Sequence, residues 1–359
     1  MSSVVFLSHT ARSGDFRVGS HHLSRELAAQ GHTVAHISTP FSLTHAALKP
    51  QQRTRRTAAF AGPVLTAGVT DFIPTPLFPA NFRWTKTQTT RALKRVGIPR
   101  PDFVFIDQPL FPSTHFPSST VVFRPTDIFR SSALTRAARG AALYADAVAA
   151  TSPKVLASVL GDSSRPNIVL ENGVEYARFA NAQANDKQYD FVYVGALDFR
   201  FDFEALSFAA RALPGSEFAI FGPMPGRLPP FPPNVQFKGP IGYECVPTAI
   251  ARGRIGLMPF VDNESNAARS PMKLYEYIAT GVPVIAPQSI VERSPGIRAL
   301  IPFTAGDSSS FAQALAETLL NNAPIGDVDR EVARSKDWSV VAAELLGFAK
   351  HVSGGKGEA

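Results

Sequence analysis

The stretch SPMKLYEYIATGVPVIA, residues 270–286, decides how the second half of the chain folds. Apolar residues recur at helical spacing over Pro271–Thr280, with the proline at the expected first turn of a helix. An apolar run of strand length, Val282–Ala286, follows directly. The stretch therefore predicts a helix that leads into a buried β-strand.

The same alternation extends to both sides of this stretch. Apolar runs that predict strands are Phe191–Gly195, Glu217–Phe221, Val235–Lys238 and Ile255–Phe260. Helical patterns lie over about Phe203–Leu213, Tyr243–Ala251 and Phe311–Leu320, and the last stretch, Val328–Val352, is also helical by pattern. Strands that alternate with helices predict a parallel sheet covered on both faces.

The first half of the chain shows a second alternation. Expected strands are Val4–Ser8, His32–Ser38, Phe103–Ile106, Val121–Phe123, Ala147–Thr151 and Ile168–Leu170, and expected helices are His21–Gln30, about Ser132–Tyr144 and one from Pro153. Residues 57–84 interrupt it with prolines and glycines among apolar residues, which predicts an irregular excursion outside the core.

The polar segment 180–188 is the best candidate for a linker between these halves. We therefore expect two doubly wound α/β domains, Rossmann-like and facing each other across a cleft. The first covers residues 1–180, with a C-terminal helix at about 338–352 packed back on it, and the second covers residues 188–337. No Gly-x-Gly-x-x-Gly follows either first strand, so a dinucleotide dehydrogenase is not indicated.

Composition is that of a soluble globular protein, with 45% hydrophobic and 18% charged residues. The single cysteine, Cys245, excludes an internal disulfide, and the N-terminus reads as a strand without a leader pattern. No uncharged apolar run approaches the length of a membrane-spanning helix. We expect a cytoplasmic protein whose membrane contact, if present, is peripheral.

Positive charge is concentrated near the N-terminus. Residues 1–100 contain thirteen Lys and Arg residues but only three acidic ones, whereas the whole chain has a net charge of +7. This excess suggests a polyanionic partner, and a solvated basic face is the plainer alternative. A nucleic-acid-binding protein would also explain it, but no recognisable reader motif accompanies the charge.

Lys273 and Glu276 lie one turn apart on the helix that opens the stretch 270–286. The free N–H groups of a first helical turn, together with a lysine, can bind a diphosphate, and a glutamate one turn later can accept ribose hydroxyls. An ordinary amphipathic helix with both charges in solvent is the alternative. The first interpretation predicts a nucleotide diphosphate site.

Asp127 follows the apolar run Val121–Phe123, at the end of a strand where ligand sites of α/β sheets lie. A carboxylate there can take a proton from a hydroxyl. Arg124 and Arg130 flank it and would keep it ionised. The alternative is that Asp127 caps the helix that begins near Ser131.

Asn172-Gly173 has either a ligand role or the role of a turn with positive φ. No His, Cys or Asp cluster has the spacing of metal ligands. Asp327-Val328-Asp329 lies in a polar stretch and is interpreted as a capping feature. We therefore expect no metal cofactor.

Several motifs resemble those of GT-B glycosyltransferases of the teichuronic-acid and capsule type. They are residues 270–287, Val192–Asp198 and Glu171–Val174. Ser8-His9, Asp15-Phe16-Arg17, Phe123–Asp127 and Met272-Lys273-Leu274 are more similar still to the glucuronosyltransferases of xanthan synthesis. The resemblance covers most of the chain.

This resemblance implies an inverting transferase that moves a sugar, by best match glucuronate from UDP-glucuronate, to a lipid-linked saccharide. It implies Asp127 as the catalytic base. It also implies donor-binding roles for Gly195, Arg200, Met272, Lys273 and Glu276, and acceptor or cleft roles for Asp15, Arg17 and Asn172. A transferase for neutral UDP- or GDP-sugars is the alternative.

The chain departs from the family pattern at three places. Glu276 stands where the glucuronosyltransferases have an amide, although it matches the ribose-binding glutamate of the broader family. The first glutamate of the family's Glu-x7-Glu motif is missing, because residue 268 is alanine. The Arg/Lys pair after the first strand of the donor half is replaced by Ala196 and a displaced Arg200.

A last expectation concerns an anionic membrane surface. The excursion at 57–84 carries the apolar residues Phe60, Phe72, Ile73, Leu77, Phe78, Phe82 and Trp84, and basic clusters, among them Lys49, Arg53, Arg55, Arg56, Arg83, Lys86, Arg91, Lys94, Arg95 and Arg100, lie on both sides of it. Apolar groups flanked by cations are typical of a peripheral anchor. A loop that packs on its own domain is the alternative.

Overall fold

The computed structural model describes residues 1–13, 17–44, 53–77, 84–129, 131–182, 184, 186–224, 226, 228, 230–321 and 325–355. The chain forms two compact units. The first contains residues 1–172, 268–270 and 338–359, and the second contains residues 173–267 and 271–337. The chain thus crosses from one unit to the other four times.

The first unit is built on an eight-stranded sheet with the order β3-β4-β2-β1-β5-β6-β7-β8. Its strands are β1 (Ser3–Ser8), β2 (Thr33–Ser38), β3 (Val64–Thr66), β4 (Val69–Phe72), β5 (Phe103–Ile106), β6 (Thr120–Phe123), β7 (Ala147–Ala150) and β8 (Asn167–Val169). All neighbours pair in parallel except β3 with β4. The central strands β5, β6 and β7 are buried along their whole length, as their continuous apolar runs predict.

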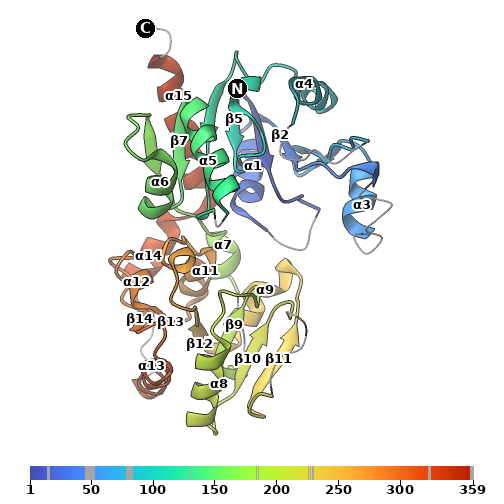
Figure 1. Cartoon of the computed structure of the whole chain (residues 1–359). Helices are drawn as coiled ribbons and strands as arrows, with labels where there is room; N and C mark the ends of the chain where they lie inside the picture. Colours follow the sequence, from blue (N-terminus) through green and yellow to red (C-terminus); the bar gives the residue numbers. More distant parts are fainter. Residues whose placement is uncertain are drawn as a thin grey trace. The chain divides into compact units, whose positions relative to one another are not determined.

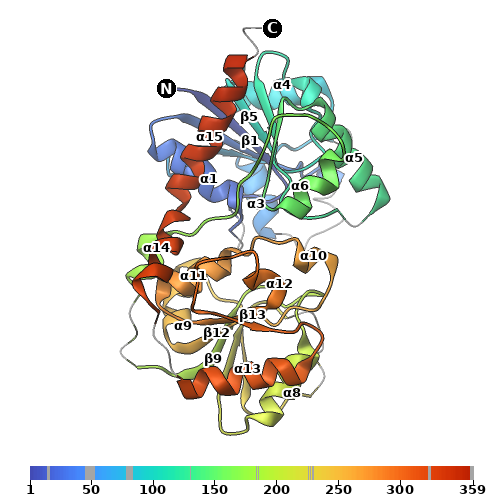
Figure 2. The same cartoon turned by 90° about the vertical axis from the view of Figure 1, so that its left-hand side faces the viewer.

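The first unit also contains helices, most of which cover this sheet (Figures 1 and 2). They are α1 (Gly19–Ala29), α3 (Arg53–Phe60), α4 (Lys86–Arg95), α5 (Ser132–Tyr144), α6 (Pro153–Leu160) and α15 (Trp338–Gly355), with a short 3₁₀ turn η1 (Ser113–His115). The C-terminal helix α15 packs against α1, where Trp338 stacks on His22 with ring centroids 5.0 Å apart. The last segment of the chain therefore belongs to the core of the first unit.

The second unit contains a fully parallel sheet with the order β11-β10-β9-β12-β13-β14. Its strands are β9 (Tyr189–Val194), β10 (Phe218–Phe221), β11 (Val235–Gly239), β12 (Gly253–Leu257), β13 (Val284–Pro287) and β14 (Leu300–Phe303). The chain order reverses between β9 and β12. In such a sheet the ligand crevice lies beyond the carboxyl ends of the strands at this switch point.

The helices of the second unit lie between and after these strands. They are α7 (Tyr176–Ala180), α8 (Phe203–Ala212), α9 (Val246–Ala251), α10 (Glu264–Ala267), α11 (Met272–Thr280), α12 (Gln288–Val291), α13 (Ser308–Asn321) and α14 (Asp327–Ser335), with a 3₁₀ turn η2 (Tyr243–Cys245). Helix α13 packs along α8 (Figure 2). The sequence-based prediction of two Rossmann-like α/β domains is thus confirmed.

Three details differ from the sequence-based expectations. The excursion at 57–84 contains β4, which pairs with β2 inside the sheet, so this part is a core element. Residues Val328–Val352 form two helices, because Asp337 leaves the helical path and accepts a hydrogen bond from the backbone N–H of Tyr176. The boundary between the units falls at Asn172 and Gly173, because α7 belongs to the second unit and precedes the expected linker.

No helix in the described part of the chain is both long and apolar enough to cross a membrane.

Candidate functional site

Gly195 and Lys273 meet at the switch point of the second sheet. Gly195 directly follows β9, and Lys273 is the second residue of α11, which follows β12 in the chain. A Cβ atom on Gly195 would overlap the ammonium group of Lys273, and one on Gly222 would overlap the carbonyl oxygen of Gly195. Glycine at these positions allows the backbone and the lysine to approach closely.

Aromatic side chains hold the Lys273 ammonium in place. Its Nζ donates a hydrogen bond of 3.0 Å to the hydroxyl of Tyr193 and lies 4.4 Å from the centroid of that ring. The Phe260 ring centroid lies 5.4 Å away. The buried Tyr193 hydroxyl in turn donates to the carbonyl of Ala196 at 2.8 Å. The charge is therefore fixed over the loop that follows β9.

Helix α11 presents its N-terminus beside this charge. Pro271 occupies the cap position, one residue outside the helix, and forms no side-chain capping bond. No acidic residue lies in the first turn, which begins with the partly buried Met272. Free N–H groups, the helix dipole and the nearby ammonium together favour an anion at this end of the helix.

Glu276 lies one turn further along α11 and is partly buried. Burial raises the pKa of its carboxyl to about 7, an effect that Lys273 opposes and Glu175 reinforces. The structure thus places Gly195, Met272, Lys273 and Glu276 in one neighbourhood. The alternative of an ordinary helix with solvated charges does not describe Lys273, whose ammonium is enclosed by rings.

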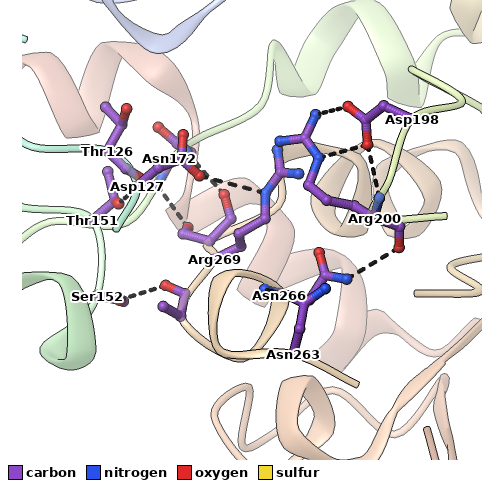
Figure 3. Close-up of polar contacts among 12 residues, drawn as sticks. Thr126, Asp127, Thr151, Ser152, Asn172, Asp198, Arg200, Asn263, Asn266 and Arg269 are labelled. Atoms are coloured by element: carbon purple, nitrogen blue, oxygen red, sulfur yellow. Dashed lines mark hydrogen bonds and ion pairs between the residues drawn. The ribbon is translucent and has the colours of Figure 1, made fainter. Parts of the chain in front are cut away.

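Arg200 lies in the loop between β9 and α8, but its guanidinium is engaged by a neighbour. Asp198 accepts hydrogen bonds from its Nε, at 2.8 Å, and from its Nη2 (Figure 3). Asn266 donates to the backbone carbonyl of Arg200 at 3.1 Å. Asp198 therefore offsets the positive charge of Arg200, the residue that the sequence analysis assigned to donor binding.

Asp127 lies in the loop that follows β6 of the first unit, and its side chain is 48% exposed. Helix α5 is capped by Ser131, whose hydroxyl accepts from the backbone N–H of Leu134 at 3.2 Å. The capping alternative for Asp127 is therefore wrong. Arg269 is its cationic neighbour, with 3.8 Å between Nε and Oδ1 (Figure 3).

The expected role of Arg124 beside Asp127 needs correction. Arg124 is buried and donates to Asp107 and to the side-chain oxygen of Asn172, each at 3.3 Å. The guanidinium of Arg124 therefore pairs with Asp107 and Asn172 and not with Asp127. Arg130, the second cation expected there, lies outside the described residues.

Asn172 anchors the segment that precedes α11. Its backbone N–H donates to the hydroxyl of Ser270 at 2.9 Å, and its side-chain amide donates to the Ser270 carbonyl at 2.8 Å. Neither Asn172 nor Gly173 has a positive φ, so the turn interpretation is wrong. Ala268 stands where the family motif has its first glutamate. Its side chain is buried against Ala150 and Val155 of the same unit, so the surroundings of this position are apolar.

The acceptor residues expected in the first loop are only partly described. Asp15 lies outside the described residues. Arg17 is exposed, and its Nη1 donates to the backbone carbonyl of Arg12. Sequence reasoning missed Arg269 and Tyr193 as neighbours of the expected site residues. Their only signal was position: Arg269 lies directly before Ser270, and Tyr193 lies inside the strand that precedes Gly195.

Within the described ranges, no group of three or more His, Cys, Asp or Glu side chains is arranged to hold a metal ion.

Part of the chain is similar in sequence to known glycosyltransferases. A family model described as "Glycosyl transferase-like" matches residues 203–324. A putative teichuronic acid biosynthesis glycosyltransferase of Bacillus subtilis, TuaH, is 29% identical over 51% of this chain and 51% of its own. The UDP-glucuronate:glycolipid 2-beta-glucuronosyltransferase of Xanthomonas campestris is 26% identical over 56% of this chain and 51% of its own. The chain thus spans about half the length of the curated relatives that it matches.

Solved structures extend the likeness of fold to the whole chain. A sucrose-phosphate synthase of Thermosynechococcus elongatus has a TM-score of 0.75 at 16% identity, over 98% of this chain and 100% of its own. A trehalose 6-phosphate synthase of Burkholderia multivorans has a TM-score of 0.66 at 12% identity, over 99% and 100%. The family model and the curated relatives describe glycosyltransferases, and the solved structures share the fold of this chain, which is the GT-B fold.

Proposed function

We propose that the protein transfers a sugar from a UDP-sugar to a lipid-linked saccharide in polysaccharide synthesis, with UDP-glucuronate as the donor. The observation that carries this proposal is the Lys273 ammonium, fixed over Gly195 beside the N-terminus of α11. The name of the Xanthomonas relative supports glucuronate and a glycolipid acceptor. The TuaH relative supports a role in polysaccharide synthesis.

In the proposed mechanism the second unit binds the donor. Negative charge develops on UDP as the bond between the anomeric carbon and the diphosphate oxygen breaks. The Lys273 ammonium and the N–H groups at the start of α11 stabilise that charge. Glu276 accepts the ribose hydroxyls, and Met272 and Arg200 complete the donor site.

The acceptor hydroxyl supplies the other half of the proposed reaction. Asp127 takes its proton as the hydroxyl oxygen attacks the anomeric carbon on the face opposite the departing UDP, and attack on that face inverts the configuration of the carbon. Half-exposed Asp127 is open to a substrate, and the guanidinium of Arg269 lies beside it, with 3.8 Å between Nε and Oδ1. Arg17 and Asn172 contribute to the acceptor side, together with Asp15.

A neutral UDP- or GDP-sugar is the alternative donor. Two departures from the family pattern, at Ala268 and Arg200, are reasons to test a neutral donor. The carboxylate of a glucuronate donor would need a cation, and the charge of Arg200 is already offset by Asp198. Nucleotide release measured with UDP-glucuronate, UDP-glucose and GDP-mannose distinguishes the two. Faster release from a neutral donor would contradict the glucuronate assignment.

The proposal includes a peripheral position on the inner face of the membrane. Exposed cations on α4 (Lys86, Arg91, Lys94 and Arg95) and exposed apolar residues nearby in the chain (Phe60, Val64, Leu65 and Leu77) support it. Phe72, Ile73 and Trp84 are buried, so these expected anchor residues are core residues instead. Phe78 and Phe82, with Lys49 and Arg83, lie outside the described residues.

Substitution of Lys273 tests the donor site. We expect Lys273→Ala to weaken UDP binding by about 1.5–3 kcal/mol, the range for a charge-assisted contact to a diphosphate, measured by calorimetry. Lys238→Ala is the matched control, because this exposed lysine of β11 lies over the Tyr189 ring. Equal UDP affinity in Lys273→Ala and the parent protein would remove Lys273 from the donor site.

A further inference from the structure

Tyr193 is a buried tyrosine at a position where a phenylalanine would fill the same space. It lies in β9 of the second unit and is 1% exposed. Its ring meets the edge of the Phe201 ring, with 4.7 Å between the centroids. Burying a hydroxyl costs free energy unless its hydrogen bonds are made. The reason for a tyrosine here therefore lies in the partners of its hydroxyl.

The Tyr193 hydroxyl makes two hydrogen bonds of different kinds. Its O–H donates to the backbone carbonyl of Ala196 at 2.8 Å, which is a local bond in the turn after β9. Its oxygen accepts from the Nζ of Lys273 at 3.0 Å, across 80 positions of sequence. The second bond joins β9 to the first turn of α11, where the proposed donor site begins.

The rings beside the Lys273 ammonium are held in place by the backbone. The ring centroid of Phe260 lies 5.4 Å from Nζ, and the backbone of Phe260 forms an antiparallel bridge with Phe201. The backbone N–H of Asp202 donates to the carbonyl of Pro259 at 2.8 Å. These bonds join the segment after β9 to the segment after β12, so both ring systems have fixed places around the ammonium.

Gly195 borders the same ammonium. A Cβ atom at this position would overlap the Nζ of Lys273 and lie 3.1 Å from the Tyr193 hydroxyl oxygen. A larger residue would therefore displace the ammonium. The Nζ of Lys273 thus lies in a narrow place between the Tyr193 hydroxyl and the backbone of Gly195.

We infer that Tyr193 is a positioning residue for donor binding: its hydroxyl holds the Lys273 ammonium at the place where the diphosphate of the donor binds. A lysine side chain is flexible, and a contact to phosphate costs less conformational entropy when the ammonium is already held. An ammonium group has three N–H donors, so one can stay on Tyr193 while the others reach phosphate oxygens. The inference rests on the proposed UDP-sugar donor and adds a residue that acts through Lys273.

A double-mutant cycle tests this role. UDP binding is measured by calorimetry for the parent protein, Tyr193→Phe, Lys273→Ala and the double variant. We expect Tyr193→Phe to weaken UDP binding about 3- to 10-fold in the parent, because the hydrogen bond to the ammonium is lost while the ring remains. In the Lys273→Ala background the same change should alter the affinity by less than about twofold, since the group that Tyr193 positions is absent.

The cycle separates positioning from a purely structural role. Tyr193→Phe also removes the bond to Ala196, and a disturbed turn or a loss of folding would weaken UDP binding in both backgrounds. Tyr189→Phe is the matched control, because Tyr189 lies on the same strand and Lys238 Nζ lies 5.4 Å from its ring centroid. This variant should bind UDP as the parent does.

The inference and the proposed function fail in different ways. Equal UDP affinity of Tyr193→Phe and the parent overturns the inference, and so does an equal loss in both backgrounds of the cycle. Either result leaves the proposed donor site in place if Lys273→Ala weakens UDP binding. Absence of UDP binding by the parent protein contradicts the proposed donor, and the role of Tyr193 falls with it.

Discussion

Asp127 is the residue on which the proposed chemistry depends most. Asp127→Asn keeps the shape of the side chain and removes the base, so turnover should fall about 10²- to 10⁴-fold while UDP affinity stays unchanged. Asp162→Asn, an exposed position of the first unit, is the control. Equal turnover of the Asp127 variant and the parent at matched folding would exclude Asp127 as the base.

Glu276 makes stability depend on pH. Its pKa is about 7 in the folded chain, whereas an unfolded glutamate has a pKa near 4.3, so between these values only the folded state retains the proton. The Glu276 contribution to stability is therefore present at about pH 4.5 and is lost as pH rises to about 7.

Glu276→Gln removes this titration. We expect the Tm of the parent minus that of the variant to decrease between about pH 4.5 and 7 and then to stay level, in thermal unfolding recorded across that range. A Tm difference between parent and variant that stays constant over this pH range would show that Glu276 ionises as a solvent-exposed carboxyl does.

Among the elements, α15 contributes to the stability of the first unit. The helix lies along α1 (Figure 2), and Trp338 at its start is 1% exposed. Trp338→Ala should reduce the free energy of unfolding by about 3–5 kcal/mol, because it leaves a cavity where the indole stacks on His22.

Urea unfolding measures this effect, and a position on the same helix provides the control. Val340 is 41% exposed, so Val340→Ala should change the free energy by no more than about 0.5 kcal/mol. Similar effects of the two variants would mean that α15 contributes to stability without the Trp338 contact.

At the scale of the whole molecule, each unit has its own hydrophobic core, and the first unit exposes the cations of α4 and the side chains of Phe60 and Leu65. We expect binding to phosphatidylglycerol vesicles and none to zwitterionic ones, with sedimentation falling between about 50 and 500 mM salt as the Debye length shortens. Phe60→Asp with Leu65→Asp should abolish sedimentation and leave UDP binding intact, since these side chains are 56% and 72% exposed.

A change of the same kind in the second unit is the control for the vesicle experiment. Phe208→Asp replaces a side chain of α8 that is 43% exposed and should sediment with vesicles as the parent does. Unchanged sedimentation of the Phe60 and Leu65 variant would indicate that the basic residues are an ordinary solvated surface.

The sequence by itself determined the alternation of strands and helices and the place of the Lys273 motif. Both follow from local periodicity and chain order, and in a parallel sheet these put the end of a buried strand and the start of the next helix at the same edge. Ser132–Tyr144, for example, is a helix with the expected bounds.

Only the tertiary structure decided which distant groups meet. Arg269 neighbours Asp127 across 142 positions of sequence. Phe72 is buried although prolines and glycines surround it, because it lies in β4, which pairs with β2 inside the sheet. Trp84 is buried where its ring meets that of Phe111. Arg124 contacts Asp107 and Asn172 instead of Asp127. Such contacts depend on which strands become neighbours and where loops return, and no local pattern of residues encodes that.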